Sequence, residues 1–233
     1  MNNTHILVVN INNLDFTQLC VYDLMLQTSP FDLTVIDQGS TEEGTKEYLK
    51  DLENFANVIY NDENVDLNRL WNNFYNNTKN PFLCFLNNDV RIPSNFISDN
   101  EEIFKREEKV GCVAHSTNHE SYQKVTELNY VIPERNYMQG WDFCMRREAY
   151  NLIPENLRTF GGDDYLYVNL YRGGWKTAFA LSSPIIHYKG QSYKDLRHPQ
   201  SSDQKEYKKL NYEGISHCHE YSKLYPTFTK IIE

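Results

Sequence analysis

Three short stretches contain the residue types that could act chemically on a charged substrate. The first, FLCFLNNDV at residues 82–90, places Asp89 after an apolar run and directly behind Asn87 and Asn88. One carboxylate beside neutral oxygen ligands suits a hard divalent cation that also holds phosphate groups. Because Asn and Asp are also common in turns, these residues alone fit either a metal site or a plain turn.

The second stretch, FGGDD, joins two glycines to the adjacent carboxylates of Asp163 and Asp164, where a helix is expected to begin. A helix N-terminus stabilises an ionised carboxylate, so the pattern predicts a general base, a helix cap, or both at once. The third stretch places His187 at the end of an apolar run. A neutral imidazole can bind a metal, although a single histidine is more often structural.

These residues must be positioned by strands and helices, and the pattern of the first 110 residues predicts such elements. Strand-like apolar runs at residues 5–9, 31–36, 57–60 and 82–86 alternate with segments of helical spacing. This alternation predicts an α/β fold with a mostly parallel central sheet and helices on both faces. In such sheets, ligands bind at the carboxyl ends of the strands. Polar residues stand at those ends, namely Asn10, Asp37, Asn64 and Asp89.

The pattern changes after residue 111. We expect strands at residues 110–114, 130–133, 140–145, 177–181 and 185–188, and helices at 146–153 and 165–172. Beyond residue 192 the chain is polar with few periodic apolar residues, so 196–233 is expected to be a tail or lid.

Composition excludes some classes of protein. The net charge of −9 argues against nucleic acid as a main partner, since a phosphate backbone is usually held by a basic face. Five scattered cysteines without a CxxC pair favour a reducing compartment. The sequence shows no signal peptide and no apolar run near the ~18 residues of a membrane span, so we expect a cytoplasmic protein.

Seven stretches, taken in order, resemble the large inverting glycosyltransferase family with the GT-A fold, often called family 2. They extend over about four-fifths of the chain, and their order is more specific than any one of them. The stretches are ILVVNINN, LTVIDQGSTEEGTKEYL, DENVDLNRLWNN, FLCFLNNDVRIP, GWDFCMRREAY, FGGDDYLYVNLYRGGWK and IIHYKGQS.

The resemblance implies a sugar transfer with inversion from a nucleotide-sugar donor, such as a UDP-sugar, to an acceptor hydroxyl. It implies one domain over residues 1–233, with the nucleotide-binding half at 1–110 and the acceptor and catalytic half at 111–195. It also implies that six residues bind the nucleotide, namely Asn10, Asn12, Asp37, Asn64, Asn72 and Asn88.

The remaining roles also follow from the resemblance. Asp89, Asn87 and His187 would hold a divalent Mn²⁺ or Mg²⁺ on the diphosphate. Asp164 would be the catalytic base with Asp163 in support. The floor for the sugar and acceptor would be formed by Gly140, Trp141 and Asp142.

The chain departs from the family pattern at three positions. Asn87 replaces the first acid of the usual DxD motif, Asp163 replaces a Glu, and Asp66 stands where a Gly is common. The first departure removes one carboxylate from the metal ligands, and the last changes the nucleotide loop.

Two other functions stay open. A nucleotidyltransferase would need a glycine-rich basic loop after the first strand, and residues 10–15 have neither feature. A degenerate transferase could instead bind carbohydrate or nucleotide without turnover. The sequence does not distinguish a glycan, a lipid, a protein or a modified nucleotide as the acceptor.

Overall fold

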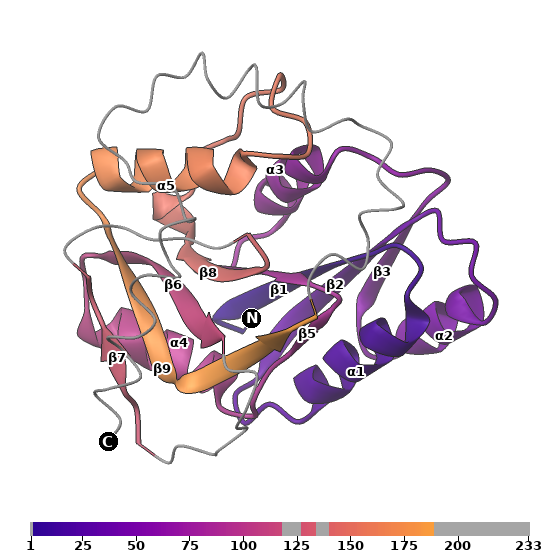
Figure 1. Cartoon of the computed structure of the whole chain (residues 1–233), viewed down its shortest axis with the longest axis horizontal. Coiled ribbons are helices and arrows are strands. Elements are labelled where there is room, and N and C mark those ends of the chain that lie inside the picture. Colours follow the sequence, from indigo (N-terminus) through magenta and orange to yellow (C-terminus); the bar gives the residue numbers. More distant parts are fainter. Residues whose placement is uncertain (1, 118–126, 134–139, 189–233) are drawn as a thin grey trace.

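The computed structural model describes residues 2–117, 127–133 and 140–188, and these form a nine-stranded sheet between two layers of helices (Figure 1). The predicted tail at 196–233 lies outside the described residues. Strand order across the sheet is β3-β2-β1-β4-β8-β6-β9-β5, with β7 paired to β9.

The first half of the chain alternates strands and helices, as its sequence predicts. Its elements are β1 (Thr4–Asn10), α1 (Leu14–Met25), β2 (Phe31–Gln38), α2 (Thr45–Leu52), β3 (Asn57–Asn61), α3 (Leu67–Asn77) and β4 (Phe82–Asn87). The four strands are parallel. Asn10 pairs with Asp37, and Val9 pairs with Asn87, so the polar residues after these strands meet at one edge of the sheet.

The second half extends the same sheet with mixed strand directions. Its elements are β5 (Val90–Arg91), α4 (Phe96–Arg106), β6 (Val110–Thr117), β7 (Tyr130–Val131), β8 (Asp142–Arg146), a 3₁₀ turn (Arg147–Ala149), α5 (Gly162–Arg172) and β9 (Lys176–His187). β8 is antiparallel to both β4 and β6, whereas β6 and β9 are parallel. Since β4 pairs with β8, the two halves share one sheet.

Two predictions in this half are wrong. The helix expected at 146–153 is a single 3₁₀ turn, because β8 continues to Arg146 and the chain is extended at Tyr150 before Pro154. The two strands expected at 177–181 and 185–188 are one strand, β9. A register shift against β6 lets β9 continue past Pro184, whose missing N–H would interrupt a regular ladder.

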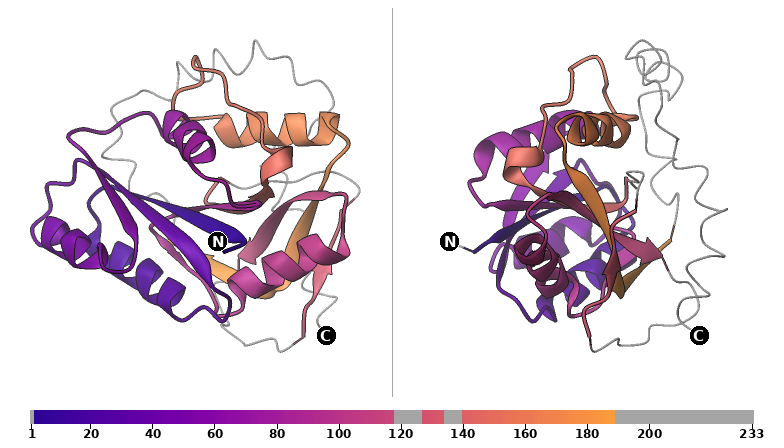
Figure 2. Two further views of the ribbon diagram at one scale, coloured as in Figure 1. Left: turned by 180° about the vertical axis from the view of Figure 1, so that it is seen from behind. Right: turned by 90° about the vertical axis from the view of Figure 1, so that its left-hand side faces the viewer.

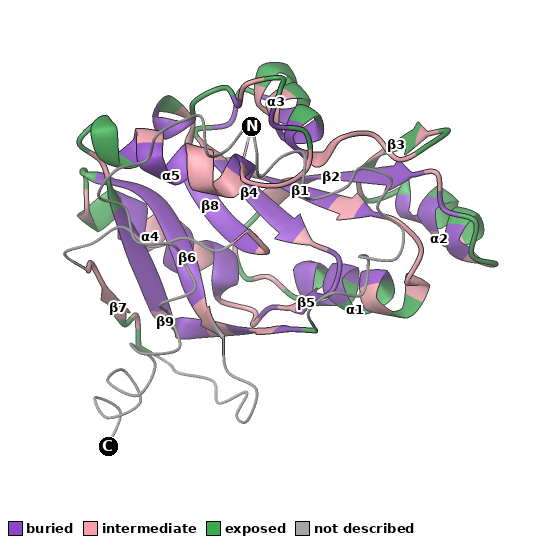
Figure 3. Cartoon of the chain, turned by 45° about the horizontal axis from the view of Figure 1, so that its top comes forward, coloured by how far each residue is buried: buried purple, intermediate pink, exposed green. Residues whose placement is uncertain are grey.

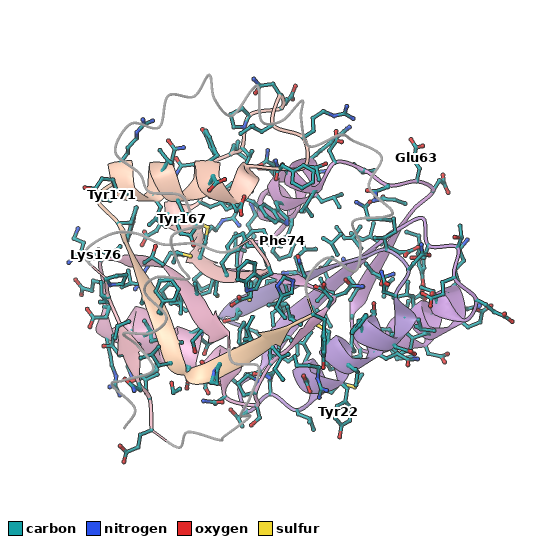
Figure 4. The ribbon with its side chains drawn as sticks, in the orientation of Figure 1. Tyr22, Glu63, Phe74, Tyr167, Tyr171 and Lys176 are labelled. Atoms are coloured by element: carbon teal, nitrogen blue, oxygen red, sulfur yellow. The ribbon has the colours of Figure 1, made fainter. Side chains whose placement is uncertain are left out.

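Helices cover both faces of the sheet, as predicted. Alternate residues of β1 point to opposite faces: Ile6 and Val8 pack with α1, α2 and α4, whereas Leu7 packs with α3 and α5 (Figure 2). The buried residues gather in the central strands and on the inner faces of the helices (Figure 3). Phe74 of α3 and Tyr167 of α5 are buried between the sheet and the layer formed by these two helices, whereas Tyr171 is exposed (Figure 4).

No helix within the described ranges is long and apolar enough to cross a lipid bilayer.

Candidate functional site

Five buried polar side chains bond to one another where β1, β2 and β4 end. We call them the amide hub: Asn10, Thr17, Asp37, Ser40 and Asn88. The Asn10 amide Nδ2 donates to Asp37 Oδ1 at 2.9 Å and to Ser40 Oγ at 3.1 Å, and Asn10 Oδ1 accepts from Thr17 Oγ1 at 2.6 Å. Asn88 Nδ2 donates to Thr17 Oγ1 at 2.9 Å. The amide hub therefore ties three strand ends to α1.

Half of the residues predicted to bind the nucleotide belong to this hub. The Asp37 carboxylate accepts from Asn10 and also from the hydroxyl and main-chain N–H of Ser40. Asp37 is only 1% exposed, and Asn88 is 3% exposed. Their contacts hold the loops that surround the site. Thr17 and Ser40 were not foreseen, because both take their role from partners on other elements.

Two other predicted nucleotide residues shape the neighbouring loops. Asn12, with a φ of 50°, accepts from the main-chain N–H groups of Thr41 and Glu42 through its Oδ1. Asn64 accepts from Gln38 Nε2 at 3.2 Å. Both side chains are only partly buried, so they lie at the surface of the loops after β1 and β3.

Asn72 lies apart from the amide hub, on α3. Its Nδ2 donates to the main-chain oxygen of Ile153 at 2.8 Å, and its Oδ1 accepts from the Ile153 N–H and the Tyr150 hydroxyl, both at 3.0 Å. Its amide thus connects α3 to the segment after β8. These bonds do not support the predicted contact between Asn72 and a nucleotide, which stays a prediction.

Two of the three predicted metal residues, Asp89 and His187, lie together beside Trp141. We call Asp89, Trp141 and His187 the open cluster. His187 ends β9 and lies opposite Val90, which brings its Nε2 to 3.4 Å from Asp89 Oδ1. The Trp141 ring stacks on the His187 ring, with centroids 4.9 Å apart and planes inclined by 19°. The main-chain N–H of Asn87 donates to the Trp141 carbonyl at 2.9 Å, which fixes this residue to the end of β4.

Each member of the open cluster has a buried polar atom with no hydrogen-bond partner among the described residues. These atoms are Asp89 Oδ1, His187 Nδ1 and Trp141 Nε1. An unsatisfied buried polar atom costs about 1–3 kcal/mol and is rare, so three in contact indicate a place where a ligand binds.

The chemistry of the open cluster fits a divalent cation in part. A carboxylate oxygen and an imidazole nitrogen are both ligands for Mn²⁺ or Mg²⁺-type sites, and 3.4 Å between Asp89 and His187 lets them share one ion. Within the described residues, no group of three or more His, Cys, Asp or Glu side chains could hold a metal. A cation here would therefore need further oxygen ligands from a substrate such as a diphosphate.

The two predicted catalytic acids, Asp163 and Asp164, begin α5 and are called the acid pair. Asp163 Oδ2 lies only 2.5 Å from the position that a Cβ on Gly140 would take, so a side chain at Gly140 would displace the Asp163 carboxylate. Gly140 precedes Trp141, and this contact therefore links the acid pair to the open cluster. Burial and the neighbouring carboxylate of Asp164 raise the pKa of Asp163 to about 7, and burial also raises the pKa of Asp164.

The start of α5 is held by α3. A Cβ on Gly162 would meet Asn68 Oδ1 at 2.0 Å, and Asn68 Nδ2 donates to the main-chain oxygen of Leu157 at 3.1 Å. Asp66 forms an ion pair with Arg158 at 2.8 Å. Gly162, which has no side chain, thus lets the start of α5 pack closely against α3. Asn68 was missed because its partners are about 90 residues further along the chain.

Asp142, predicted as part of the acceptor floor, is fully buried. Its Oδ2 lies 2.6 Å from Nδ1 of His115, which is also fully buried. Gly140 and Trp141 remain partly exposed. Of the three predicted floor residues, these two are therefore the ones that a substrate can reach in this structure.

Comparison with known proteins identifies the family and the fold of the chain. The family described as Glycosyl transferase family 2 matches residues 5–167. No curated protein matches the chain.

Three solved structures share the fold at low sequence identity. S. aureus TarS 1–349 in complex with UDP-GlcNAc has a TM-score of 0.66 and 14% identity, covering 87% of this chain and 64% of that one. GalNAc-T7 with UDP, GalNAc and Mn²⁺ has a TM-score of 0.64 and 15% identity, covering 80% and 44%. The mannosyltransferase PcManGT from Pyrobaculum calidifontis, in complex with GDP-Man and Mn²⁺, has a TM-score of 0.63 and 13% identity, covering 82% and 58%.

The chain thus spans between 44% and 64% of the length of these three proteins. At such identities the likeness shows the fold, and the family match extends over more than half of the chain. This chain belongs to glycosyl transferase family 2 and has the GT-A fold of these glycosyltransferases.

Proposed function

We propose that this protein transfers a sugar from a nucleoside diphosphate sugar, a UDP-sugar in the first instance, to an acceptor hydroxyl with inversion at the anomeric carbon. The observation that carries the proposal is the open cluster, whose three unpaired buried polar atoms lie next to the acid pair through Gly140. One region can hold a charged leaving group and the other can accept a proton, as this reaction requires.

The open cluster would hold the diphosphate side of the donor. Asp89 and His187 would bind the divalent cation, and Asn87 and the diphosphate oxygens would supply further ligands. Such an ion, Mn²⁺ or Mg²⁺, neutralises the charge that develops on the leaving diphosphate. Two of the similar structures contain a nucleotide and Mn²⁺, which supports this choice.

The acid pair would act on the acceptor. Neighbouring residues on a helix do not share a face, so one carboxylate can face the acceptor while the other orients it. Asp163 is held against Gly140, which leaves Asp164 as the base. In the reaction, the acceptor oxygen bonds to the anomeric carbon as the bond from that carbon to the diphosphate breaks. Asp164 takes the hydroxyl proton, and a single displacement inverts the configuration.

The pKa values of the acid pair support this role. A general base works best when its pKa is close to the working pH, and burial raises the pKa of both carboxyl groups toward neutrality. The nucleotide side would lie in residues 1–110, and the acceptor side in residues 111–195. A cytoplasmic location is also part of the proposal, since the four described cysteines are free and buried.

A donor screen tests the proposal. Purified protein is heated with a panel of UDP- and GDP-sugars, with Mn²⁺ or with EDTA, and its melting temperature is recorded. A ligand at 100 times its Kd stabilises by about 2.7 kcal/mol, so we expect a clear metal-dependent rise with at least one UDP-sugar. Hydrolysis of that donor is then measured without acceptor.

Two results would count against the proposal. If no nucleotide sugar raises the melting temperature with either Mn²⁺ or Mg²⁺, the donor assignment is wrong. If a donor binds but neither hydrolysis nor transfer to sugar, lipid or peptide hydroxyls is detected, the chain is a binding module.

A further inference from the structure

A buried polar pair lies behind the open cluster, and the proposed reaction does not use it. His115 is on β6, and Asp142 begins β8. Their Nδ1 and Oδ2 atoms are 2.6 Å apart, and both side chains are fully buried. The His115 ring also stacks on Phe96 of α4, with centroids 4.2 Å apart, so the pair is held on more than one side.

Asp142 is placed to fix Trp141. The two residues are adjacent in the chain, and Asp142 pairs with Leu86 of β4. The Trp141 carbonyl accepts from Asn87, the next residue of β4. With Asp142 anchored in the interior by His115 and the Trp141 carbonyl bonded to Asn87, the main chain at Trp141 is fixed at two points, and its indole stacks on the His187 ring.

His115 is also placed to fix the path of β9. It pairs with Ala180, and directly afterwards the register shifts, so that Thr117 pairs with Ile185. Past this shift, β9 leaves β6 for β5 and brings His187 beside Asp89. His115 thus lies at the point where β9 changes partner.

We propose that the His115–Asp142 pair is a positioning device that sets the Trp141–His187 stack, and with it the arrangement of the open cluster toward the donor diphosphate. The part about the diphosphate rests on the proposed function, whereas the part about the stack does not. Stability alone is a weak reason for such a pair, because well-packed apolar residues in place of a buried pair are often neutral or stabilising.

The test compares variants that separate stability from positioning. His115→Leu with Asp142→Leu replaces the pair by apolar side chains and leaves no buried charge unpaired. His115→Asn keeps a donor near the Nδ1 position. The matched control is Asn80→Leu, because Asn80 is also buried and donates to Asp32 at 2.6 Å at the opposite end of the sheet.

Two readouts are used on each folded variant. Nuclear magnetic resonance follows the Trp141 indole N–H, assigned with Trp141→Phe, and its contacts with the His187 ring. Calorimetry gives the Kd of UDP with Mn²⁺. For the double Leu variant we expect a melting temperature near that of the wild type, a loss of the indole–imidazole contacts, and a Kd raised about tenfold, as when side chains that orient metal ligands are removed.

His115→Asn should keep the contacts and come within a fewfold of the wild-type Kd, and Asn80→Leu should leave both readouts unchanged. The proposal is overturned if the folded double variant keeps the ring contacts and the Kd. If the double variant does not fold, Asp142→Leu, which removes the acceptor of His115, is measured in its place, with the same expected losses and the same refutation. If wild-type protein binds no UDP, the proposed function fails, while the ring contacts still decide the positioning role.

Discussion

The amide hub and the open cluster lie at the same edge of the sheet, yet they differ in hydrogen bonding. The polar atoms of the hub bond to one another, whereas the open cluster has buried polar atoms without a hydrogen-bond partner among the described residues. Asn88 and Asp89 are consecutive residues of the turn after β4. The Asn88 amide donates within the hub, to Asn10 and Thr17. Asp89 Oδ1, by contrast, is buried without a hydrogen-bond partner among the described residues. Asn88 therefore stabilises the turn, whereas the Asp89 carboxylate has an oxygen that a ligand could bind.

This contrast teaches which residues should serve stability and which should serve binding. A satisfied internal hydrogen bond contributes about 1 kcal/mol, so the hub stabilises the loops that surround the site. The unsatisfied atoms of the open cluster cost free energy in the empty protein, as functional groups often do. Changes in the hub should therefore lower stability, and changes in the open cluster should lower affinity.

The largest effect is expected at the acid pair, which contacts Gly140 next to the open cluster. Asp164→Asn should lower turnover by roughly 10²–10⁴-fold, because a general base acts only as the bond forms. Donor affinity should survive, since the base contributes little to ground-state binding. Turnover and donor Kd are measured separately with a working donor and acceptor.

Asp163→Asn is the matched variant, and it should reduce turnover less than Asp164→Asn does. If Asp163→Asn removes turnover while Asp164→Asn keeps it, the two roles must be exchanged. If both variants stay near wild-type turnover, the acid pair is not the base.

The next effect is expected in the open cluster itself. Asp89→Ala and His187→Ala should each weaken UDP binding in the presence of Mn²⁺ by about tenfold or more, and much less in EDTA, because each removes a ligand of the cation. Calorimetry with Mn²⁺ and with EDTA gives the Kd of UDP for each variant under both conditions. Asp89→Ala should lower the melting temperature of the empty protein only slightly, since Asp89 Oδ1 has no hydrogen-bond partner among the described residues and only a 3.4 Å contact with His187 Nε2. His187→Ala also removes the ring that stacks on Trp141, so it should lower the melting temperature more.

Controls for this prediction lie at the opposite end of the sheet. Asp32→Ala removes a carboxylate that accepts from Asn2 and Asn80, and His5→Ala removes a ring that contacts Thr34. Both should leave the Kd unchanged. Equal UDP affinity of wild-type protein with Mn²⁺ and with EDTA would contradict the metal assignment.

A smaller effect, on stability and not on binding, is expected in the amide hub. Asn10→Ala removes four internal hydrogen bonds and leaves buried partners unsatisfied, so the free energy of unfolding should fall by about 1–3 kcal/mol. Urea unfolding measures this loss, and Asn72→Ala should behave alike, because Asn72 makes three internal bonds. A large rise in donor Kd for folded Asn10→Ala would show instead that Asn10 contacts the nucleoside.

The first half of the fold could be predicted because its strands and helices have clear apolar periods. The same pattern located the edge where Asn10, Asp37 and Asp89 meet. The second half was less predictable. The direction of β8 depends on pairing with β4 and β6, and the continuity of β9 across Pro184 depends on a register shift. Neither is encoded in local periodicity.

The limits of the site prediction have the same origin. Asp89 and Asp142 are both acids beside a strand end, but Asp142 turns inward to His115. That orientation follows from the pleat of β8 against its neighbours. Likewise, Ser40 and Asn68 look ordinary in the sequence and gain their roles from residues far along the chain.

The raised pKa values of the acid pair predict how activity depends on pH. Burial raises the pKa of Asp164, and burial with the neighbouring carboxylate of Asp164 raises the pKa of Asp163 to about 7. The base must be ionised, so kcat/KM should fall with falling pH at a pH above the ordinary carboxyl value of about 4. An acid limb near pH 4 in wild-type protein would contradict the raised values.

Stability gives an independent check of the same shift, and its sign is fixed. A carboxyl group with a folded-state pKa above its unfolded value binds its proton more tightly in the folded protein. Its contribution to stability is therefore complete below the ordinary pKa of about 4 and is lost as the pH rises through about 7. Wild-type protein should lose stability between pH 5 and pH 8 relative to Asp163→Asn, measured by urea unfolding at each pH. Parallel stability curves for the two proteins would mean that Asp163 is not protonated in the folded state, and the raised pKa would no longer support a base near neutrality.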